Sequence, residues 1–189
     1  LDAENLRSGF AEMVKHALID TRTEWNEILK FDLENVNFET LKVLVERSIR
    51  IKERVVEQDP YEANIRKALN LGHTFGHAFE SHSYKTNRPV LHGYAVMRGL
   101  LCELYLSYVK LNFPKDDLLK LKYLIKEYYG TFSIDCNDYD AVFEWMTHDI
   151  KHDSKEINFT LLSDIGEIQI NQTATKEEIF ECFDFFAGI

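Results

Sequence analysis

Two histidines at helical spacing are the first residues whose types and positions could do chemistry. His73 and His77 lie four residues apart in a segment, 62–82, that the sequence predicts to be one helix. Residues three or four apart share a helix face, so the two imidazoles could bind one metal ion. The same predicted face carries further polar side chains at spacings of three or four residues, namely Arg66, Asn70 and Glu80.

A polar helix face is also typical of ordinary solvent-exposed helices, so a solvated stripe is an equal alternative from this pattern alone. The stripe combines two imidazoles and an amide and contains no lysine, which is unusual for a purely solubilising surface. An H-E-x-x-H metalloprotease site is excluded, because residues 74–76 between the histidines are Thr-Phe-Gly and provide no glutamate base. Gly72 and Gly76 fall on the opposite, apolar face, where they would let another backbone approach closely.

Other candidate side chains lie on separate predicted helices. Glu12 and Lys15 are one turn apart, which fits either an exposed ion pair or two site residues. Lys52 interrupts the apolar stripe of its predicted helix, where a lysine either extends its charge to solvent or has a function. His92, at the expected start of another helix, is either a cap-region residue or a ligand. Catalytic zinc takes three protein ligands of these types and keeps an open position, but spacing does not say which three converge.

The elements that must position these residues are mainly helices. The sequence has only 3 prolines and 8 glycines, which favours long helices. A hairpin is expected where two β-type stretches, 157–162 and 167–170, flank an Asp-Ile-Gly turn. Thr175 and Glu178 form a capping box that starts the last helix. The remaining expected helices cover residues 8–20, 25–30, 40–58, 93–111, 115–129 and 138–148.

The composition fits a soluble globular domain and argues against several other classes of protein. The chain is 45% hydrophobic and 29% charged, and its net charge of −10 is the opposite of a nucleic-acid-binding footprint. No apolar run approaches the ~18–20 residues of a membrane span, and the first residues do not resemble a signal peptide. We therefore expect a cytoplasmic protein. Cys102, Cys136 and Cys182 lack metal-knuckle spacing and are expected to be reduced.

The domain organisation is expected to be simple. No repeat or linker divides the chain, so residues 1–189 are predicted to form a single helical domain. The sequence contains no G-x-G-x-x-G, no P-loop and no βαβ alternation, so it offers no usual cradle for a dinucleotide. It also starts without methionine, which suggests a piece of a longer polypeptide.

Three segments, in order, resemble the signature sequences of the 3-dehydroquinate synthase family. They are SGFAEMVK at 8–15, LNLGHTFGHAFE at 69–80 and LHG at 91–93. The similarity continues to the Asp-Ile-Lys of residues 149–151 and the LLxxIG of 161–166. It spans nearly all of this chain but only the second half of a typical member. The resemblance therefore implies the helical C-terminal metal- and substrate-binding domain, with the N-terminal NAD-binding domain absent.

The resemblance also implies roles for individual residues. The family's zinc (or cobalt) ligands fall on Glu12, His73 and His92. Catalytic roles fall on Lys15, Lys52, Asn70 and His77. The side chains that would bind the phosphate, carboxylate and hydroxyls of the substrate are Lys15, Lys52, Arg66, Asn70, His77 and Lys151. Tyr94 stands where the family usually has a glutamate.

In the family reaction, NAD oxidises a hydroxyl of 3-deoxy-D-arabino-heptulosonate 7-phosphate, phosphate is eliminated, and NAD returns the hydride. Ring opening and aldol closure then give 3-dehydroquinate, a step of the shikimate pathway. We expect the full-length enzyme to be a homodimer and the isolated chain to be catalytically silent. The alternatives are a related cyclase such as 2-epi-5-epi-valiolone synthase, a metal-dependent alcohol dehydrogenase, and a non-catalytic helical binding module.

Overall fold

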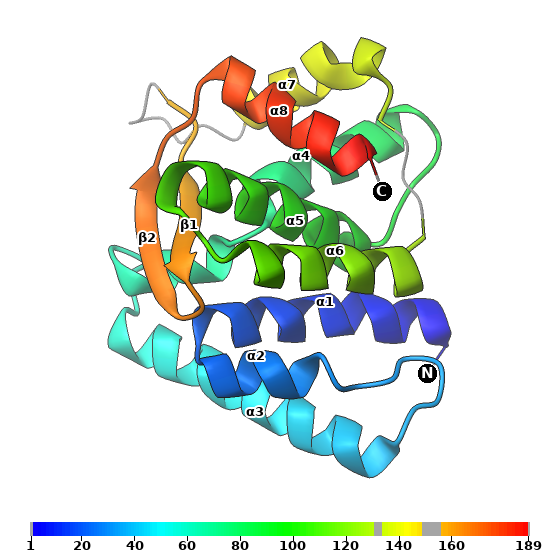
Figure 1. Cartoon of the computed structure of the whole chain (residues 1–189), viewed down its shortest axis with the longest axis vertical. Helices are drawn as coiled ribbons and strands as arrows, with labels where there is room; N and C mark the ends of the chain where they lie inside the picture. Colours follow the sequence, from blue (N-terminus) through cyan, green and yellow to red (C-terminus); the bar gives the residue numbers. More distant parts are fainter. Residues whose placement is uncertain (1, 131–133, 149–155, 189) are drawn as a thin grey trace.

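The computed structural model describes residues 2–130, 134–148 and 156–188, and it confirms a mainly helical chain with one β-hairpin (Figure 1). The helices are α1 (Ala3–Ile19), α2 (Arg22–Ile28), α3 (Phe38–Gln58), α4 (His73–Lys85), α5 (His92–Leu111), α6 (Lys115–Tyr128), α7 (Tyr139–His148) and α8 (Lys176–Ala187), with short 3-10 helices η1 (Ile65–Asn70) and η2 (Cys136–Asp138). The predicted hairpin consists of β1 (Phe159–Asp164) and β2 (Glu167–Gln172), which pair antiparallel.

Side-chain caps determine where the first and last helices begin. Asp2 accepts a hydrogen bond from the backbone N–H of Asn5, so α1 starts earlier than the predicted residue 8. In the predicted capping box, Thr175 accepts from the N–H of Glu178, whose carboxylate accepts from the N–H of Thr175. Local sequence is therefore sufficient to fix these two helix starts.

Helix α5 is the centre of the fold and packs against α1, α4, α6, α8 and β1 (Figure 1). Its residues are apolar on almost every side, as expected for a helix that is covered all round. Val96, Leu100 and Leu104 are fully buried in it. On one side, aromatic rings connect α4 to α8, with Phe75 and Phe183 in an edge-to-face contact at 5.8 Å.

The prediction of one continuous helix over 62–82 is wrong. The carboxylate of Asp59 accepts hydrogen bonds from three backbone N–H groups, those of Ala63, Asn64 and Arg66, and so folds this segment into a turn before η1. Gly72 then adopts the left-handed conformation (φ +81°), and α4 begins at the next residue. Arg66 and Asn70 therefore do not share a helix face with the residues of α4.

Close backbone contacts at two glycines of α5 hold this helix against α1 and against the start of α4. A Cβ built on Gly99 of α5 would lie 1.9 Å from the carbonyl oxygen of Gly72, just before α4. A Cβ on Gly93 would lie 2.0 Å from the carbonyl oxygen of Ser8 on α1. The Ser8 hydroxyl also accepts a hydrogen bond from the Gly93 N–H at 3.0 Å. The predicted close approach at Gly72 is confirmed, and α1, α4 and α5 meet where the candidate residues lie.

No helix within the described ranges is long and apolar enough to cross a membrane. The cysteines are unpaired; Cys102 and Cys182 are buried and Cys136 is exposed.

Candidate functional site

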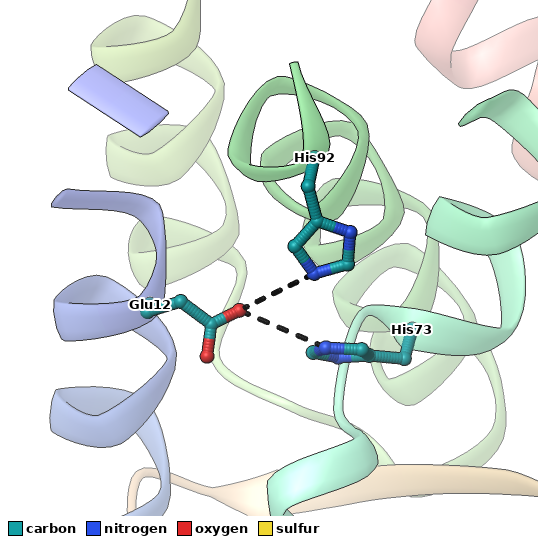
Figure 2. Close-up of side chains that lie close together, drawn as sticks. All are labelled: Glu12, His73 and His92. Carbon is teal, nitrogen blue, oxygen red and sulfur yellow. Dashed lines mark ion pairs between the residues drawn. The ribbon is translucent and has the colours of Figure 1, made fainter. Parts of the chain in front are cut away.

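Glu12, His73 and His92 converge from three different helices (Figure 2). Glu12 lies on α1, and each histidine is the first residue of its helix, α4 or α5. One ligand atom from each residue lies within 4.8 Å of the other two. The Oε1 oxygen of Glu12 is 3.7 Å from Nε2 of His73 and 4.0 Å from Nε2 of His92. A carboxylate oxygen and two imidazole nitrogens, the atom types that zinc prefers, thus face one point.

Only one of the two carboxylate oxygens of Glu12 has a hydrogen-bond partner among the described residues. Its Oε2 oxygen accepts a hydrogen bond from Nζ of Lys15 at 2.6 Å. Its Oε1 oxygen is buried and has no hydrogen-bond partner among the described residues. A buried unpaired carboxylate oxygen is unfavourable. A cation between this oxygen and the two imidazoles would satisfy it, so the residues present fit a bound metal ion.

The second nitrogen of each imidazole is held by an acceptor. Nδ1 of His73 lies 3.2 Å from the carbonyl oxygen of Leu71, and Nδ1 of His92 lies 3.0 Å from Oε2 of Glu80. Because carbonyl and carboxylate oxygens accept hydrogen bonds, each Nδ1 carries a hydrogen, and in the neutral form of that tautomer Nε2 keeps its lone pair. Both lone pairs are therefore available on the side of Glu12, which is the arrangement typical of metal-binding histidines.

Burial and the nearby ammonium set the charges at this point. Burial, together with the charge of Lys15, lowers the pKa of His73 to about 4, so its imidazole is neutral at pH 7. Burial opposes ionisation of Glu12, but the charge and hydrogen bond of Lys15 hold the pKa of that carboxyl below its ordinary value. Lys15 itself is only 3% exposed, and burial lowers the pKa of its ammonium. The alternative of an exposed Glu12–Lys15 ion pair is therefore wrong.

Lys52 does not interrupt the buried stripe of α3, so that prediction is wrong. The buried residues of the helix are Leu44, Ser48, Ile51 and Val55. Lys52 is one position away from this stripe and is exposed. Its ammonium is nevertheless close enough to α1 to contribute to the lowered pKa values of Lys15 and His16, after burial and other charges. Lys52 thus faces the same region as the converging residues.

The other predicted substrate-binding residues lie on different elements. His77 is exposed on α4, with its ring centroid 5.3 Å from that of His73. Arg66 and Asn70 lie on η1, which packs against α1, α3 and the hairpin. Arg66 donates a hydrogen bond to the carbonyl oxygen of Pro60 at 2.7 Å. Lys151 lies outside the described residues.

Two supporting carboxylates were not assigned roles from the sequence. Glu80 was placed on the polar stripe by its spacing, but its hydrogen bond to His92 depends on how α4 and α5 pack. Glu103 is fully buried and accepts hydrogen bonds from the N–H groups of Gly72 and Thr74. The available signal was its position as the only acidic residue in the apolar stretch 93–111.

Comparison with known proteins identifies the family of the chain. Residues 9–152 match the family model described as 3-dehydroquinate synthase C-terminal. The chain belongs to this family. The 3-dehydroquinate synthase of Parabacteroides distasonis is 50% identical over 186 residues, which cover 98% of this chain and 53% of that protein. That of Listeria monocytogenes is 38% identical over 187 residues, 97% of this chain and 50% of that protein. The chain thus spans about half the length of these relatives.

Two solved structures of synthases have the same fold as this chain. The 2-epi-5-epi-valiolone synthase of Streptomyces hygroscopicus, with NAD+ and Zn2+ bound, aligns over 100% of this chain and 52% of its own, with a TM-score of 0.83 at 20% identity. A 2-deoxy-scyllo-inosose synthase complexed with carbaglucose-6-phosphate, NAD+ and Co2+ aligns over 97% and 53%, with a TM-score of 0.79 at 23% identity. These likenesses confirm the predicted fold of the C-terminal domain.

Proposed function

We propose that this chain is the metal- and substrate-binding half of a 3-dehydroquinate synthase, which converts 3-deoxy-D-arabino-heptulosonate 7-phosphate into 3-dehydroquinate and phosphate. The observation that carries the proposal is the buried, unpaired oxygen of Glu12, which faces Nε2 of both His73 and His92 in a chain of this family. The proposal includes a cytoplasmic, homodimeric full-length enzyme.

Glu12, His73 and His92 would hold a zinc or cobalt ion. When bound, the ion supplies Lewis acidity toward a substrate oxygen and a fixed point for orienting it. The neutral state of His73, whose pKa burial lowers to about 4, supports this role because only an unprotonated imidazole donates a lone pair. Lys15 keeps the carboxylate ionised and holds its second oxygen, so the other oxygen is directed toward the histidines.

The cationic side chains would bind the two anionic groups of the substrate. Lys15 and Lys52 are close enough to influence each other, and paired positive charges attract a carboxylate or phosphate. Arg66 on η1 and Lys151 would add further charge. His77, exposed beside His73, would hold the phosphate or move a proton during its elimination, because histidine exchanges protons near neutral pH.

Asn70 would bind a substrate hydroxyl. Its Nδ2 donates a hydrogen bond to Oε1 of Glu62 at 2.8 Å. Because a carboxylate only accepts, the amide nitrogen must face Glu62, and this leaves the amide oxygen to accept from a ligand. Glu62 thereby sets which end of the Asn70 amide the substrate meets.

NAD is assigned to a part of the enzyme other than this chain. The sequence contains no glycine-rich dinucleotide loop, so we assign none of its residues to that cofactor. NAD, when bound, supplies the temporary oxidation of a substrate hydroxyl. We accordingly expect the isolated chain to be catalytically silent, and NAD-dependent turnover by the chain alone would contradict this.

Zinc content tests the proposed centre directly. We expect about one zinc per chain in the wild type and its loss in Glu12→Ala, His73→Ala and His92→Ala. His148→Ala, which removes an exposed histidine on α7, is the control and should keep the metal. If both the wild-type chain and the full-length polypeptide fold without binding zinc, the ligand assignment is wrong.

Turnover of the full-length enzyme tests the substrate. Seven-carbon sugar phosphates with and without the carboxylate should be compared by phosphate release in the presence of NAD. We expect the acid to be the preferred substrate and the preference to fall in Arg66→Gln or Lys52→Gln. Preference for the sugar phosphate that lacks the carboxylate would instead identify a related cyclase, the class to which the solved structures of the same fold belong.

A further inference from the structure

Glu103 places a carboxylate at the start of α4 although it belongs to α5. Its side chain is fully buried. Oε2 accepts a hydrogen bond from the N–H of Gly72 at 2.5 Å, and Oε1 accepts from the N–H of Thr74 at 3.2 Å. Both oxygens of one side chain are therefore used on two backbone groups that lie two residues apart.

These hydrogen bonds replace a cap that α4 lacks. The residue at its N-cap is Gly72, which has no side chain to accept from the first N–H groups of the helix. A carboxylate is favourable here, because it also interacts with the positive end of the helix dipole. In the sequence, this carboxylate comes 31 residues after Gly72. The start of α4 is thus ordered by tertiary packing and not by its local sequence.

The two bonded N–H groups lie on either side of His73. Glu103 thereby fixes the backbone immediately before and after this residue. The carbonyl oxygen of Leu71, in the same turn, lies 3.2 Å from Nδ1 of the imidazole and sets the direction of the ring. With backbone and ring both held, Nε2 lies 3.7 Å from Oε1 of Glu12.

We propose that Glu103 is a positioning residue for the candidate metal centre, holding the turn around His73 so that its Nε2 faces Glu12 before an ion binds. This inference rests on the proposed function, because the centre is the site assigned to the metal there. Among the described residues, the side chain of Glu103 hydrogen-bonds to backbone N–H groups and to none of the proposed ligand side chains. It acts through the backbone of Gly72 and Thr74.

A neutral substitute of the same shape provides the test. Burial raises the pKa of Glu103, whereas the N–H groups that it binds lower it, so the hydrogen bonds to this turn are what favours the charged form at this buried position. Glu103→Gln keeps one acceptor oxygen and turns an NH2 group toward the other N–H. Two donors then face each other, and one side of the turn loses its restraint.

Asp117→Asn is the matched control. Asp117 is a second buried carboxylate, 3% exposed, that accepts a hydrogen bond from Nε1 of Trp25 at 2.9 Å and so ties α6 to α2. It contacts neither α4 nor the start of α5 through any hydrogen bond among the described residues. Its loss is expected to reduce stability without changing the orientation of His73.

The measurements are zinc affinity by competition titration and the absorption spectrum of the cobalt-loaded chain. We expect Glu103→Gln to bind zinc about 10-fold more weakly or worse, with a shifted cobalt spectrum, because residues that orient metal ligands have effects of this size. Asp117→Asn should match the wild type in both measurements. Wild-type affinity and spectrum in Glu103→Gln would overturn the inference, as would an equal loss in Asp117→Asn. If neither the wild-type chain nor the full-length polypeptide binds zinc, the metal assignment in the proposed function is what fails.

Hydrogen exchange in the metal-free wild type decides the question if Glu103→Gln does not fold, and also if no metal binds. We expect the N–H groups of Gly72 and Thr74 to be protected to the level of amides inside α4. Fast exchange of both, at the rate of a frayed helix end, would show that Glu103 does not hold this turn and would overturn the inference.

Discussion

The Oε1 oxygen of Glu12 lies 3.7 Å from Nε2 of His73 and is buried with no hydrogen-bond partner among the described residues. Leaving a buried acceptor unsatisfied costs on the order of 1–3 kcal/mol. The surrounding contacts maintain this unfavourable arrangement, since Lys15 holds the other oxygen and Leu71 holds the far side of the imidazole. The unsatisfied oxygen therefore lowers the free energy of unfolding of the metal-free chain, and it lies at the point where we propose that an ion binds.

Replacing Lys15 by methionine tests how much the ammonium group of Lys15 stabilises the carboxylate of Glu12. The change keeps an unbranched side chain that is one atom shorter and removes its charge, which leaves both oxygens of Glu12 without a hydrogen-bond partner among the described residues. We expect the metal-free chain to lose about 1–3 kcal/mol of unfolding free energy. Zinc should restore more stability to Lys15→Met than to the wild type, because the ion replaces the lost positive charge. Thermal unfolding with and without zinc measures both effects.

Lys30→Met is the control for that change. Lys30 and Glu27 form an ion pair with the same i,i+3 spacing, but the lysine side chain is 70% exposed. Exposed pairs contribute little, so the variant should stay within about 0.5 kcal/mol of the wild type. Equal effects of the two substitutions would show that burial of Lys15 has no energetic consequence.

Glu80 is expected to control the orientation of His92. The imidazole of His92 is 46% exposed, so packing restrains it weakly and the 3.0 Å hydrogen bond to Glu80 has more influence. We expect Glu80→Ala to weaken zinc binding 10- to 100-fold, and Glu80→Gln to weaken it less because an acceptor oxygen remains. Glu144→Ala removes an exposed glutamate beside an exposed histidine, His148, and should have no effect. Unchanged zinc affinity in Glu80→Ala would exclude the role.

Gly99 and Gly9 are both helical glycines and should respond oppositely to alanine. A Cβ on Gly99 would lie 1.9 Å from the Gly72 carbonyl oxygen, whereas a Cβ on Gly9 meets nothing within 4 Å. We expect Gly9→Ala to stabilise the chain by roughly 0.5–1 kcal/mol through helix propensity. Gly99→Ala should lose at least ~1–3 kcal/mol from overpacking and also weaken zinc binding, because α4 must move. Denaturant unfolding of both variants checks the difference in sign, and stabilisation by Gly99→Ala would contradict the packing.

The sequence predicts the helices and the hairpin well wherever local signals are sufficient. The capping box at Thr175 and the turn before β2 specify their elements through neighbouring residues. The segment 62–82 was mispredicted because polar residues continue at helical spacing across a turn that is not helical. That turn is set by three hydrogen bonds to Asp59 and by the positive φ of Gly72, which the periodicity does not reveal.

Residue patterns predict the candidate site less completely than they predict the fold. Its three converging side chains lie on separate helices, and the spacing within each helix says nothing about how α1, α4 and α5 pack. The family resemblance, and not the periodicity, singled out Glu12 with His73 and His92. Burial of Lys15 could not be predicted either. An ion pair with i,i+3 spacing has the same sequence pattern whether its helix face is exposed or buried.

His16 is a buried titratable group next to the site. It is 4% exposed, its Nδ1 lies 2.7 Å from the hydroxyl of Ser48 on α3, and its Nε2 is buried without a partner among the described residues. Burial lowers its pKa from 6.5 to about 4; the charges of Lys15 and Lys52 act in the same direction and that of Glu12 opposes them. Folding therefore requires the neutral imidazole.

This lowered pKa predicts how stability changes with pH. Between about pH 6.5 and pH 4 the unfolded chain binds a proton at residue 16 that the folded chain does not. The contribution to stability is thus complete above pH 6.5 and falls as the pH is lowered, by at most about 1.4 kcal/mol per pH unit for one histidine. In the metal-free chain His73 acts in the same sense. We expect His16→Leu to flatten the slope of unfolding free energy between pH 6.5 and 4.5, measured in urea, while the exposed-site control His148→Leu keeps it. An unchanged slope in His16→Leu would mean that His16 is already protonated in the folded chain.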